Sequence, residues 1–564
     1  TVNLGTVNPS GTNLAELKKL ADQTGIARIN GDFTISAADI DTIDDYANLT
    51  TSNNYINFTL DNAVTVAQAA ALAGLTSGTV SYAQGIQDSI DKFANTDRTT
   101  NFNAALAKDS TVDISVTGTQ TTAANITSLN KIIDGLTSGD VTATISADKS
   151  VVAGLSGFSN KNLTITVSDA MSVSEFDTVD ATSSNNVTLT SGLSDSLGNL
   201  APSGNVASGV TNAAAQDAGA TLNVTVTPAV TANHSHLNTL INAVPGTTTV
   251  SVSGTITELT GLTNADTSDP ITYTISSGNA DVSQLNDLAE GTSLANISFT
   301  SGGIADTLAK LIDTDHTSET NHLTAALAHL STAPTIALTT VTLSSNNNII
   351  AFNSLAGKAV GAITGQLNDN NGQYLLATTG AGVTQLVTSA DDVITLSYGT
   401  TAADDNKITK LISNAQINGT STFTGSLTGI SAAQATTIGS STHLNDATGD
   451  SNNTSTMTFT TNEAVSPTVA ANLAGKGTAV YGSGLTGAIG DYSSASALVS
   501  AYDTASTEDA DVAVAITGTL STSDHILALN RLAAETSGNI TATITAGASV
   551  VAGISGISNK NTTI

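Results

Sequence analysis

Residues 112–119 read VDISVTGT, and a similar sequence, VAVAITGT, occupies residues 512–519, which is 400 residues further along the chain. Residues 151–157, VVAGLSG, return as VVAGISG at 550–556, an offset of 399 residues. The matches share their order and their spacing. A repeat this long and this faithful indicates that the chain is an array of related copies. Its period is therefore the first property to establish.

The same long period reaches other parts of the chain. The sequence TSGDVTATI at 137–145 matches TSGNITATI at 536–544. Near the start, ARING at 27–31 resembles AQING at 415–419, at a smaller offset of 388 residues. We attribute the drift in offset to an insertion near residues 421–427.

These offsets predict the domain organisation. We expect residues 1–400 to form one super-repeat and residues 401–564 to begin the next, in one continuous array without a clear linker. At the offset of 399, Ile564 corresponds to Ile165, inside a strand-like stretch. We therefore expect these residues to be a window of a longer protein. In such an array, copy number sets the length.

Composition narrows the class of protein. Charged residues make up 11% of the chain, against about 25% in ordinary globular proteins, and aromatic residues 3%. The apolar content of 40% still allows a core, which must be thin and aliphatic. The absence of cysteine excludes disulfides and thiol catalysis. No run of about 18 apolar residues occurs, so we expect no membrane span.

The net charge of −31, from 47 acidic and 16 basic residues, limits the classes of partner that we expect the chain to bind. Phosphate backbones are bound by clustered lysine and arginine, so this charge argues against nucleic acid. It suits a solvated, self-repelling surface or one that attracts cations.

Alternation of apolar residues with Thr, Ser or Asn predicts many short strands, whose starts are mostly 22 to 33 residues apart. They are residues 32–35, 55–60, 79–82, 112–116, 141–145, 163–167, 187–189, 222–226, 249–252, 271–275, 295–299, 336–343, 374–377, 393–397, 456–459, 512–516 and 540–544.

Between many of these strands, apolar residues at i, i+3 and i+4 predict short helices, at 14–21, 66–72, 126–133, 237–241, 285–288, 308–312 and 527–532. Glycine often follows, and we expect Gly139, Gly246, Gly291 and Gly538 to serve helix ends that need a positive φ. A strand, a helix and another strand within about 30 residues is the spacing of a right-handed parallel crossover.

Repeating that crossover gives a repeat protein, a solenoid with a parallel sheet and 22–33 residues per coil, nested in the super-repeat of 400 residues. Two versions fit the pattern: an α/β solenoid with helices behind the sheet, or a pure β-solenoid with coils of about 20 residues and no helices. The i, i+3, i+4 clusters favour the α/β version.

Four Leu-Asn pairs, at Asn130, Asn238, Asn286 and Asn530, fall at the same place in four segments. An asparagine repeated at one point of each coil can stack into a hydrogen-bonded ladder that satisfies main-chain groups between coils. The alternative is an exposed helix position in a chain rich in asparagine.

Carboxylate loops are the best candidates for a metal site. Asp446 and Asp450 lie in the sequence NDATGDSN, and calcium takes six to eight oxygen ligands of this kind. We therefore predict calcium at Asp446 and Asp450, with the alternative that Asp and Asn simply fill turns. Other acidic turns contain Asp266, Asp269, Asp313, Asp315, Asp391, Asp392, Asp404, Asp405, Glu508, Asp509 and Asp511.

The histidines and the known catalytic motifs do not indicate a functional site. The groups His316, His322, His329 and His234, His236 lack the spacing and the carboxylate that zinc sites use, so we interpret them as surface residues. No nucleotide-binding or nucleophile motif occurs. A polysaccharide-cleaving solenoid would need acids, aromatic residues and basic groups at one place, and here aromatic residues are scattered.

The acidic, cysteine-free pattern LN-x-x-I/L followed by TSG-x-V/I-TATI resembles the giant repetitive cell-surface proteins of marine cyanobacteria. The likeness covers the whole chain and is one of repeat style. It implies an extracellular, export-dependent protein with a structural or adhesive role.

Two functions follow as expectations. The first is a non-catalytic structural protein of the cell exterior, a filament, fibre or surface layer, whose partner is itself or the continuation of a longer chain. The alternative is a solenoid adhesin or a protein that binds or cleaves cell-surface polysaccharide.

Overall fold

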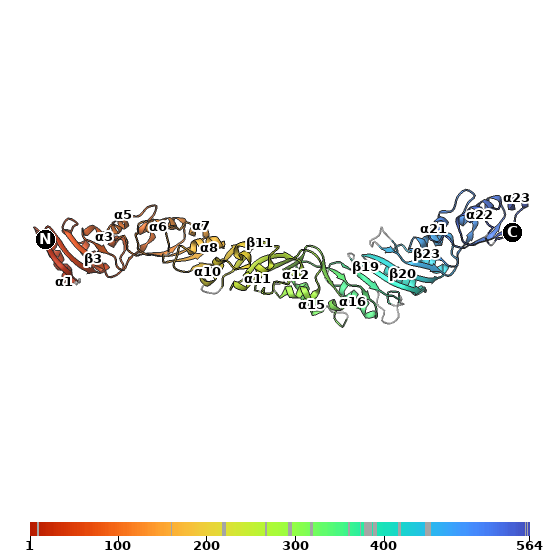
Figure 1. Ribbon diagram of the computed structural model, residues 1–564, viewed down its shortest axis with the longest axis horizontal. Helices are drawn as coiled ribbons and strands as arrows, with labels where there is room; N and C mark the ends of the chain where they lie inside the picture. Colours follow the sequence, from red (N-terminus) through yellow and green to blue (C-terminus); the bar gives the residue numbers. More distant parts are fainter. Residues whose placement is uncertain are drawn as a thin grey trace. The chain divides into compact units, whose positions relative to one another are not determined.

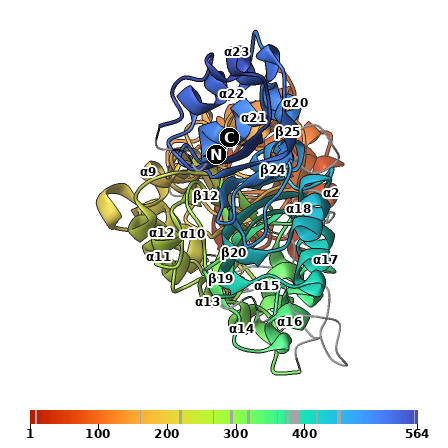
Figure 2. The same cartoon turned by 90° about the vertical axis from the view of Figure 1, so that its right-hand side faces the viewer.

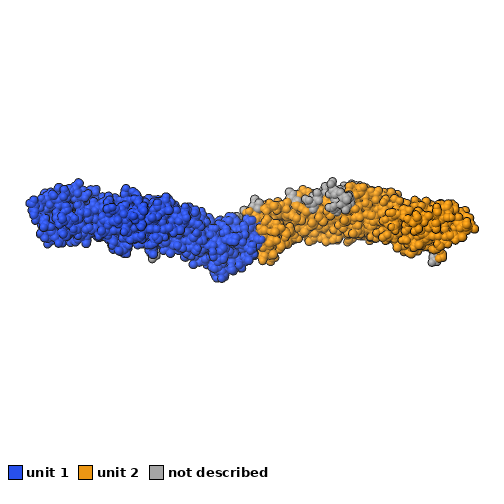
Figure 3. Space-filling model, turned by 90° about the horizontal axis from the view of Figure 1, so that it is seen from above, with its two compact units in different colours: residues 1–253, 261–273, 291–293 blue, residues 254–260, 274–290, 294–564 orange. Residues whose placement is uncertain are grey.

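The computed structural model describes residues 1–7, 11–159, 161–216, 221–265, 268–290, 296–315, 320–358, 361–370, 372, 374–376, 386, 392–415, 419–445, 453–558, 560 and 562–564. They form two compact units (Figure 3). Unit 1 contains residues 1–253 and 261–273. Unit 2 contains residues 254–260, 274–290 and 294–564.

Unit 1 is built on parallel sheets. The first has the strand order β1-β2-β3-β4, the second β5-β6-β7-β8-β9, and a third begins β10-β11-β12. Their bounds are β1 (Val2–Val7), β2 (Ile29–Ile35), β3 (Asn54–Leu60), β4 (Val80–Ser81), β5 (Ile86–Ser89), β6 (Ile114–Gln120), β7 (Val141–Ala147), β8 (Leu163–Val167), β9 (Val187–Leu189), β10 (Leu193–Asp195), β11 (Val224–Val230) and β12 (Thr248–Gly254). Strands β13 (Ile271–Ile275) and β14 (Ile297–Phe299) follow along the chain.

Unit 2 repeats this plan. One sheet has the order β15-β16-β18-β19-β20-β22-β23, with β17 on β18 and β21 on β20, and another has the order β24-β25-β26-β27. The strands are β15 (Gly303–Asp306), β16 (Thr335–Leu338), β17 (Val341–Thr342), β18 (Ile363–Asn368), β19 (Val393–Ala402), β20 (Thr420–Ile430), β21 (Thr454–Ser455), β22 (Thr458–Thr461), β23 (Thr478–Tyr481), β24 (Leu485–Ala488), β25 (Val514–Leu520), β26 (Ile540–Ile544) and β27 (Thr562–Thr563).

Helices separate most of the paired strands along the chain (Figure 1). They are α1 (Gly11–Ala21), α2 (Ala37–Asp44), α3 (Val66–Leu75), α4 (Ile90–Phe93), α5 (Thr100–Leu106), α6 (Ala123–Ile133), α7 (Lys149–Val152), α8 (Val173–Asp180), α9 (Leu197–Leu200), α10 (Ser208–Gln216), α11 (His234–Ala243), α12 (Ile256–Leu259), α13 (Val282–Ala289), α14 (Leu308–Leu311), α15 (Asn321–His329), α16 (Asn346–Ala356), α17 (Asp405–Asn414), α18 (Ala432–Gly439), α19 (Pro467–Ala474), α20 (Ile489–Tyr492), α21 (Ser500–Glu508), α22 (Ser523–Glu535) and α23 (Ala548–Val551).

Each helical cluster expected from the sequence lies in a helix, namely α1, α3, α6, α11, α13, α14 and α22, except that α14 ends at Leu311 and Ile312 is extended. The chain is therefore a mixed α/β protein with parallel sheets, and the helix-free alternative is wrong. Helices of successive segments pack on one another, as α17 and α18 do in unit 2 (Figure 2).

The core lies between one face of each sheet and the helices. It is mostly aliphatic, as expected, but it also contains fully buried Phe and Tyr rings such as Phe102 and Tyr502. In β7, Val141, Ala143 and Ile145 are buried, whereas Thr142 and Thr144 between them are exposed. Helix α6 buries an apolar stripe made of Ile126, Leu129, Ile132 and Ile133. The apolar residues that recur with a period of two in the strand and of about 3.6 in the helix therefore pack in one layer. The opposite face of β7 is a polar surface of Thr and Ser.

Two strand predictions are wrong in detail. Residues 374–376, the described part of the expected strand 374–377, are not a strand. The amides of Tyr374 and Leu375 donate instead to Oδ2 of Asp369, at 2.7 and 2.8 Å, so a carboxylate takes the groups that a strand partner would use. The expected strand 336–343 divides into β16 and β17.

Candidate functional site

The recurrent polar feature of both units is a contact between successive strand–helix segments. At the start of five helices, the first helical amide donates to a side-chain oxygen 22 to 31 residues further along. We call this the helix-start contact. It joins Ala37 to Asn62 (2.8 Å), Val66 to Asp88 (3.1 Å), Val173 to Asp195 (3.1 Å), Val282 to Asp306 (3.3 Å) and Ala432 to Glu463 (2.9 Å).

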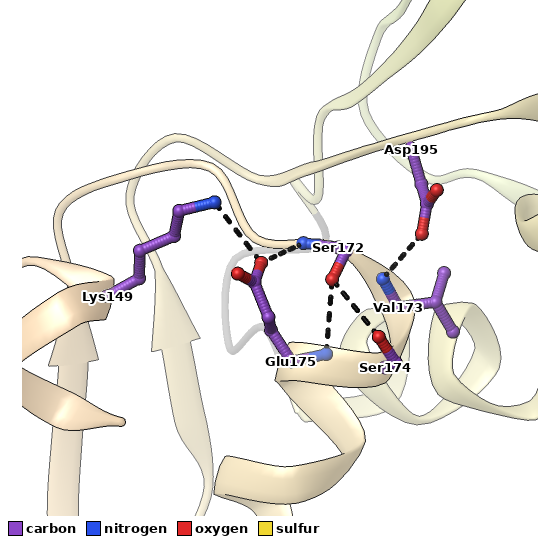
Figure 4. Close-up of polar contacts among 6 residues, drawn as sticks. All are labelled: Lys149, Ser172, Val173, Ser174, Glu175 and Asp195. Atoms are coloured by element: carbon purple, nitrogen blue, oxygen red, sulfur yellow. Dashed lines mark hydrogen bonds and ion pairs between the residues drawn. The ribbon is translucent and has the colours of Figure 1, made fainter. Parts of the chain in front are cut away.

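Helix α8 shows how this contact completes a helix N-terminus (Figure 4). The Ser172 amide donates to Oε2 of Glu175 at 2.7 Å, and the Glu175 amide donates to Oγ of Ser172 at 3.2 Å. The Val173 amide between them donates to Oδ2 of Asp195. The free amides of a helix start need acceptors, and here a capping box supplies two and the next segment a third.

The same site carries an ion pair from the preceding segment. Lys149 Nζ lies 3.2 Å from Oε2 of Glu175, with both side chains about two-fifths exposed. The backbone amide of Ser172 and then Lys149 lower the pKa of Glu175 below its ordinary value, against an opposing effect of burial. Helix α8 is thus bonded to the segments on both sides of it.

A second class of contact lies where strands begin. A side-chain oxygen accepts the amide of a residue at or just before the next strand, 22 to 27 residues further along. The pairs are Asn57 with Thr79 (2.9 Å), Asn223 with Thr247 (3.0 Å), Asn279 with Gly303 (3.0 Å) and Asp113 with Asp140 (2.8 Å).

The asparagines of the Leu-Asn pairs also bond to the following segment. Asn130 Nδ2 donates to the Gly154 carbonyl at 2.7 Å, and its Oδ1 accepts the Ser156 amide at 3.0 Å. Asn530 makes the same two bonds, to Gly553 at 2.8 Å and from Ser555 at 2.8 Å. The predicted role in satisfying main-chain groups is confirmed. The predicted stacking of asparagine on asparagine is wrong for these two.

The other two pairs vary this arrangement. Asn238 Oδ1 accepts the Asn264 amide at 3.0 Å, and Asn286 Nδ2 donates to the His322 carbonyl at 3.0 Å. Each again reaches main-chain groups of the following segment. The main-chain group that each asparagine binds thus differs between segments, and for Asn286 it lies in helix α15.

The glycines that follow the helices have another role than the one predicted. Gly139, Gly246 and Gly538 are not among the residues with positive φ. A Cβ on Gly139 would lie 1.9 Å from the carbonyl oxygen of Val112, and one on Gly538 would lie 2.1 Å from that of Asp511. These positions need glycine because two main chains pass too closely for a side chain. Gly291 lies outside the described residues.

The predicted calcium ligands, Asp446 and Asp450, lie outside the described residues. Among the other acidic turns, several carboxylates accept main-chain amides. Asp269 binds the Thr248 amide at 2.6 Å, and Asp392 binds that of Ile363 at 2.7 Å. The described part of the chain has no group of three or more His, Asp or Glu side chains placed to hold a metal.

The described histidines of the two groups named above lie in two helices. His322 and His329 lie in α15, and His234 and His236 lie in α11, while His316 is outside the described residues. The His234 ring nitrogen Nε2 lies 3.2 Å from the Ser253 carbonyl oxygen.

Sequence reasoning missed the helix-start contact, although its signal is readable. Four of the five helices begin with Ser, Thr or Asp followed three residues later by Glu or Gln, the capping-box pattern. An Asp, Asn or Glu then recurs 22 to 31 residues after the first helical residue. The two features occur together at these four helices.

No protein-family model matches the chain, and no curated protein matches it significantly. Among the described residues, no helix is both long and apolar enough to cross a membrane.

Proposed function

We propose that the chain is a non-catalytic structural protein of the cell exterior that forms a filament, fibre or surface layer. Its strand–helix segments stack as coils of an α/β solenoid, with 22–33 residues per coil, nested in a super-repeat of 400 residues. The observation that carries the proposal is that side chains at recurrent positions bind main-chain groups of the next segment. Such contacts make each segment a platform for another.

The identity of the partner follows from the same feature. In each contact one partner is a main-chain group, which any residue except proline can supply, so another copy or a continuing chain offers suitable partners. Parallel strands at the ends of such a stack would carry unpaired main-chain groups that favour addition of further strands. The partner that we propose is therefore the protein itself.

Charge and composition support an exterior location. The net charge of −31 gives a solvated surface that disfavours nucleic acid. Without cysteine, the fold depends on stacking and on hydrogen bonds between segments instead of disulfides. A calcium ion at Asp446 and Asp450 is a separate part of the proposal.

Electron microscopy of negatively stained, purified protein, with and without a calcium chelator, tests the proposal. We expect regular fibres or sheets whose axial repeat matches a whole number of super-repeats. Discrete particles at every concentration and calcium level would contradict it. The variant Asp446→Asn with Asp450→Asn serves as a matched control, because it removes the predicted calcium ligands and changes none of the side chains named in the segment contacts above.

A further inference from the structure

Unit 1 has a polar groove of about 500 Å³ on the open face of its first sheet. Strands β1, β2 and β3 and the loop before β4 line it, and its hydrogen-bonding side chains include Asn3, Arg28, Asn30, Asp32, Tyr55 and Asn57. The opposite face of these strands carries the buried core, including Ile29, Phe33 and Phe58. The groove is therefore a surface feature on a rigid base.

The side chains in the groove hold each other in fixed orientations. The Arg28 guanidinium lies 3.9 Å from the centroid of the Tyr55 ring, and its Nε donates to Oδ1 of Asn30 at 2.7 Å. Asn30 Nδ2 in turn donates to Oδ1 of Asn3 at 2.6 Å. A guanidinium stacked on an aromatic ring is a preorganised set of donors, since little side-chain freedom is left to lose on binding.

A second hydrogen-bonded row lies beside the first. Asn57 Nδ2 donates to Oδ1 of Asp32 at 2.9 Å, while Asn57 Oδ1 accepts from Thr79. In the described part of the chain, the terminal nitrogens of Arg28 and the second oxygen of Asp32 have no hydrogen-bond partner. The groove thus offers fixed donors and a fixed acceptor to a ligand.

We propose that this groove binds a neutral, hydroxyl-rich polysaccharide chain that lies across strands β1 to β3. Hydroxyl groups both donate and accept hydrogen bonds, so they suit the guanidinium on one side and the carboxylate on the other. Adjacent strands are about 4.8 Å apart, close to the length of one sugar ring along an extended chain. Successive rings would meet successive rows of polar side chains.

Charge selects the neutral ligand. Arg28 and Asp32 are the charged residues that line the groove, and their charges cancel. An acidic polysaccharide would meet the Asp32 carboxylate and a molecule with a net charge of −31. A basic polymer would meet the Arg28 guanidinium. A neutral chain avoids both penalties.

Unit 2 provides an internal comparison. On the open face of its largest sheet, Thr395 pairs with Thr422, and the Thr422 hydroxyl lies 3.2 Å from that of Thr454. These short side chains have neither the reach nor the planar polar groups of Arg28 and Asn30. The inference is thus specific to the groove in unit 1, and it does not depend on the assembly proposed above.

Isothermal titration calorimetry with the whole chain tests it. The probes are neutral hexasaccharides, one β-linked glucan and one β-linked mannan, with a hexauronate of equal length for comparison. We expect saturable binding of at least one neutral probe, nearly unchanged between low and high salt. Binding of the hexauronate alone, or of no probe at millimolar concentration, would overturn the inference.

Variants locate the site. Arg28→Ala and Asp32→Ala each remove a charged hydrogen-bonding group, and each should weaken binding about tenfold. Tyr55 acts as a positioning residue, so Tyr55→Leu should weaken binding whereas Tyr55→Phe should retain it. Thr422→Ala in unit 2 should leave the affinity unchanged. Equal affinity in Arg28→Ala and the unmodified chain would refute the proposed groove even if a neutral probe binds.

Discussion

Residues 64–163 in unit 1 and residues 465–563 in unit 2 are two copies of one structure. The first runs from α3 through β4, β5, α4, α5, β6, α6 and β7 to α7, and the second from α19 through β23, β24, α20, α21, β25, α22 and β26 to α23. Even single hydrogen bonds recur. Tyr82 donates its hydroxyl to the Ala69 carbonyl at 3.0 Å, and Tyr481 donates to that of Ala470 at 2.8 Å.

The copies share an irregularity as well. Pairing of β6 with β7 shifts between Ser115 and Thr119, and pairing of β25 with β26 shifts between Ala515 and Thr519. Gly118 and Gly518, with φ of 77° and 82°, lie inside the two shifts. A strand bulge of this kind needs a residue that tolerates positive φ, so both copies keep glycine.

The differences lie elsewhere. The buried pair Phe93 and Phe102 becomes Tyr492 and Tyr502, and both pairs pack edge to face, with ring centroids 5.2 and 5.6 Å apart. Exposed polar contacts differ more between the two copies than these buried contacts do. The comparison teaches that close main-chain approaches and the asparagine contacts are kept. The contacts of Val66 with Asp88 and of Asp113 with Asp140 are lost in the second copy, because Pro467 has no amide and Ala513 has no side-chain oxygen.

The largest expected effect comes from the buried rings. Phe102→Ala and Tyr502→Ala each remove a fully buried ring, and each should lower the local free energy of opening by about 3–5 kcal/mol. Hydrogen exchange of peptides from β6 and β25 in the whole chain measures this. The control Tyr502→Phe keeps the shape and should cost less than about 1.5 kcal/mol. A large loss in one copy with none in the other would break the equivalence of the two cores.

The next effect concerns the close approach of main chains. Gly139→Ala and Gly538→Ala place a Cβ against a carbonyl oxygen, and each should cost about 2–3 kcal/mol in its own copy. Hydrogen exchange of β7 and β26 reports the loss. As a control, Gly74→Ala in α3 has no atom within 4 Å and should stabilise the helix by about 0.5–1 kcal/mol. If Gly139→Ala causes no loss of stability, the two main-chain segments can move apart at that position.

Much of the fold could be predicted from periodicity. Strands such as β7 and helices such as α6 bury one face each, so their apolar residues recur at periods of two and about 3.6. Short strands such as β5 and β10 were not predicted, because each has a single buried apolar residue, Ile86 or Leu193, and therefore no periodic pattern.

The contacts between segments could be predicted only in part. The recurrence of Asn130 and Asn530 indicated a bond across segments, but its partner depends on how the next loop approaches in space. Acidic residues such as Asp195 and Asp306 lie at the ends of strands. The sequence alone does not show whether such a residue binds calcium or accepts a hydrogen bond from a helix amide.

The asparagine contact gives a smaller effect. Asn130→Ala and Asn530→Ala each remove two hydrogen bonds to the following segment and should each cost about 1–2 kcal/mol. Exchange protection of Ser156 and Ser555 should fall in the respective copy. Thr127→Ala is the control, since its hydroxyl bonds within α6 to Ala123, and it should cost less than about 0.5 kcal/mol. Unchanged protection of Ser156 would mean that the asparagine is dispensable.

A difference between the copies predicts a difference in pH response. In unit 1, Thr111 donates its amide and hydroxyl to Asp109, at 3.0 and 2.7 Å. In unit 2 the corresponding residue is Asp511, and burial together with Asp511 raises the pKa of Asp509. A raised carboxyl pKa means that the folded state favours the protonated form, so this contribution to stability is lost as the pH rises through the folded pKa.

The variant Asp511→Thr should lower the pKa of Asp509 and flatten the pH dependence of exchange in residues 509–514 as the pH rises above the unfolded pKa of about 3.9. Carboxyl chemical shifts from NMR follow the Asp509 titration. No change in the Asp509 titration on removal of Asp511 would assign the raised pKa to burial alone.

The smallest effect distinguishes the copies at one helix start. In unit 1, Asp148 accepts the Ser150 hydroxyl at 2.6 Å and the Val151 amide at 2.9 Å, and these bonds lower the pKa of Asp148. In unit 2, Gly547 precedes α23 and has no side chain to accept a bond. A lowered carboxyl pKa gives stability above the unfolded pKa of about 3.9, which is lost as the pH falls through the folded pKa.

Helix α7 should therefore exchange faster relative to α23 as the pH falls below about 4, after correction for intrinsic exchange rates. Asp148→Gly should abolish that difference, and Gly547→Asp should create the same acid response in α23. Because the two changes exchange a single side chain between otherwise similar helix starts, a response that stays with α7 after Asp148→Gly must come from the surrounding segments. In that case the copies would differ in how their segments pack, and not only in the polar residues of their turns.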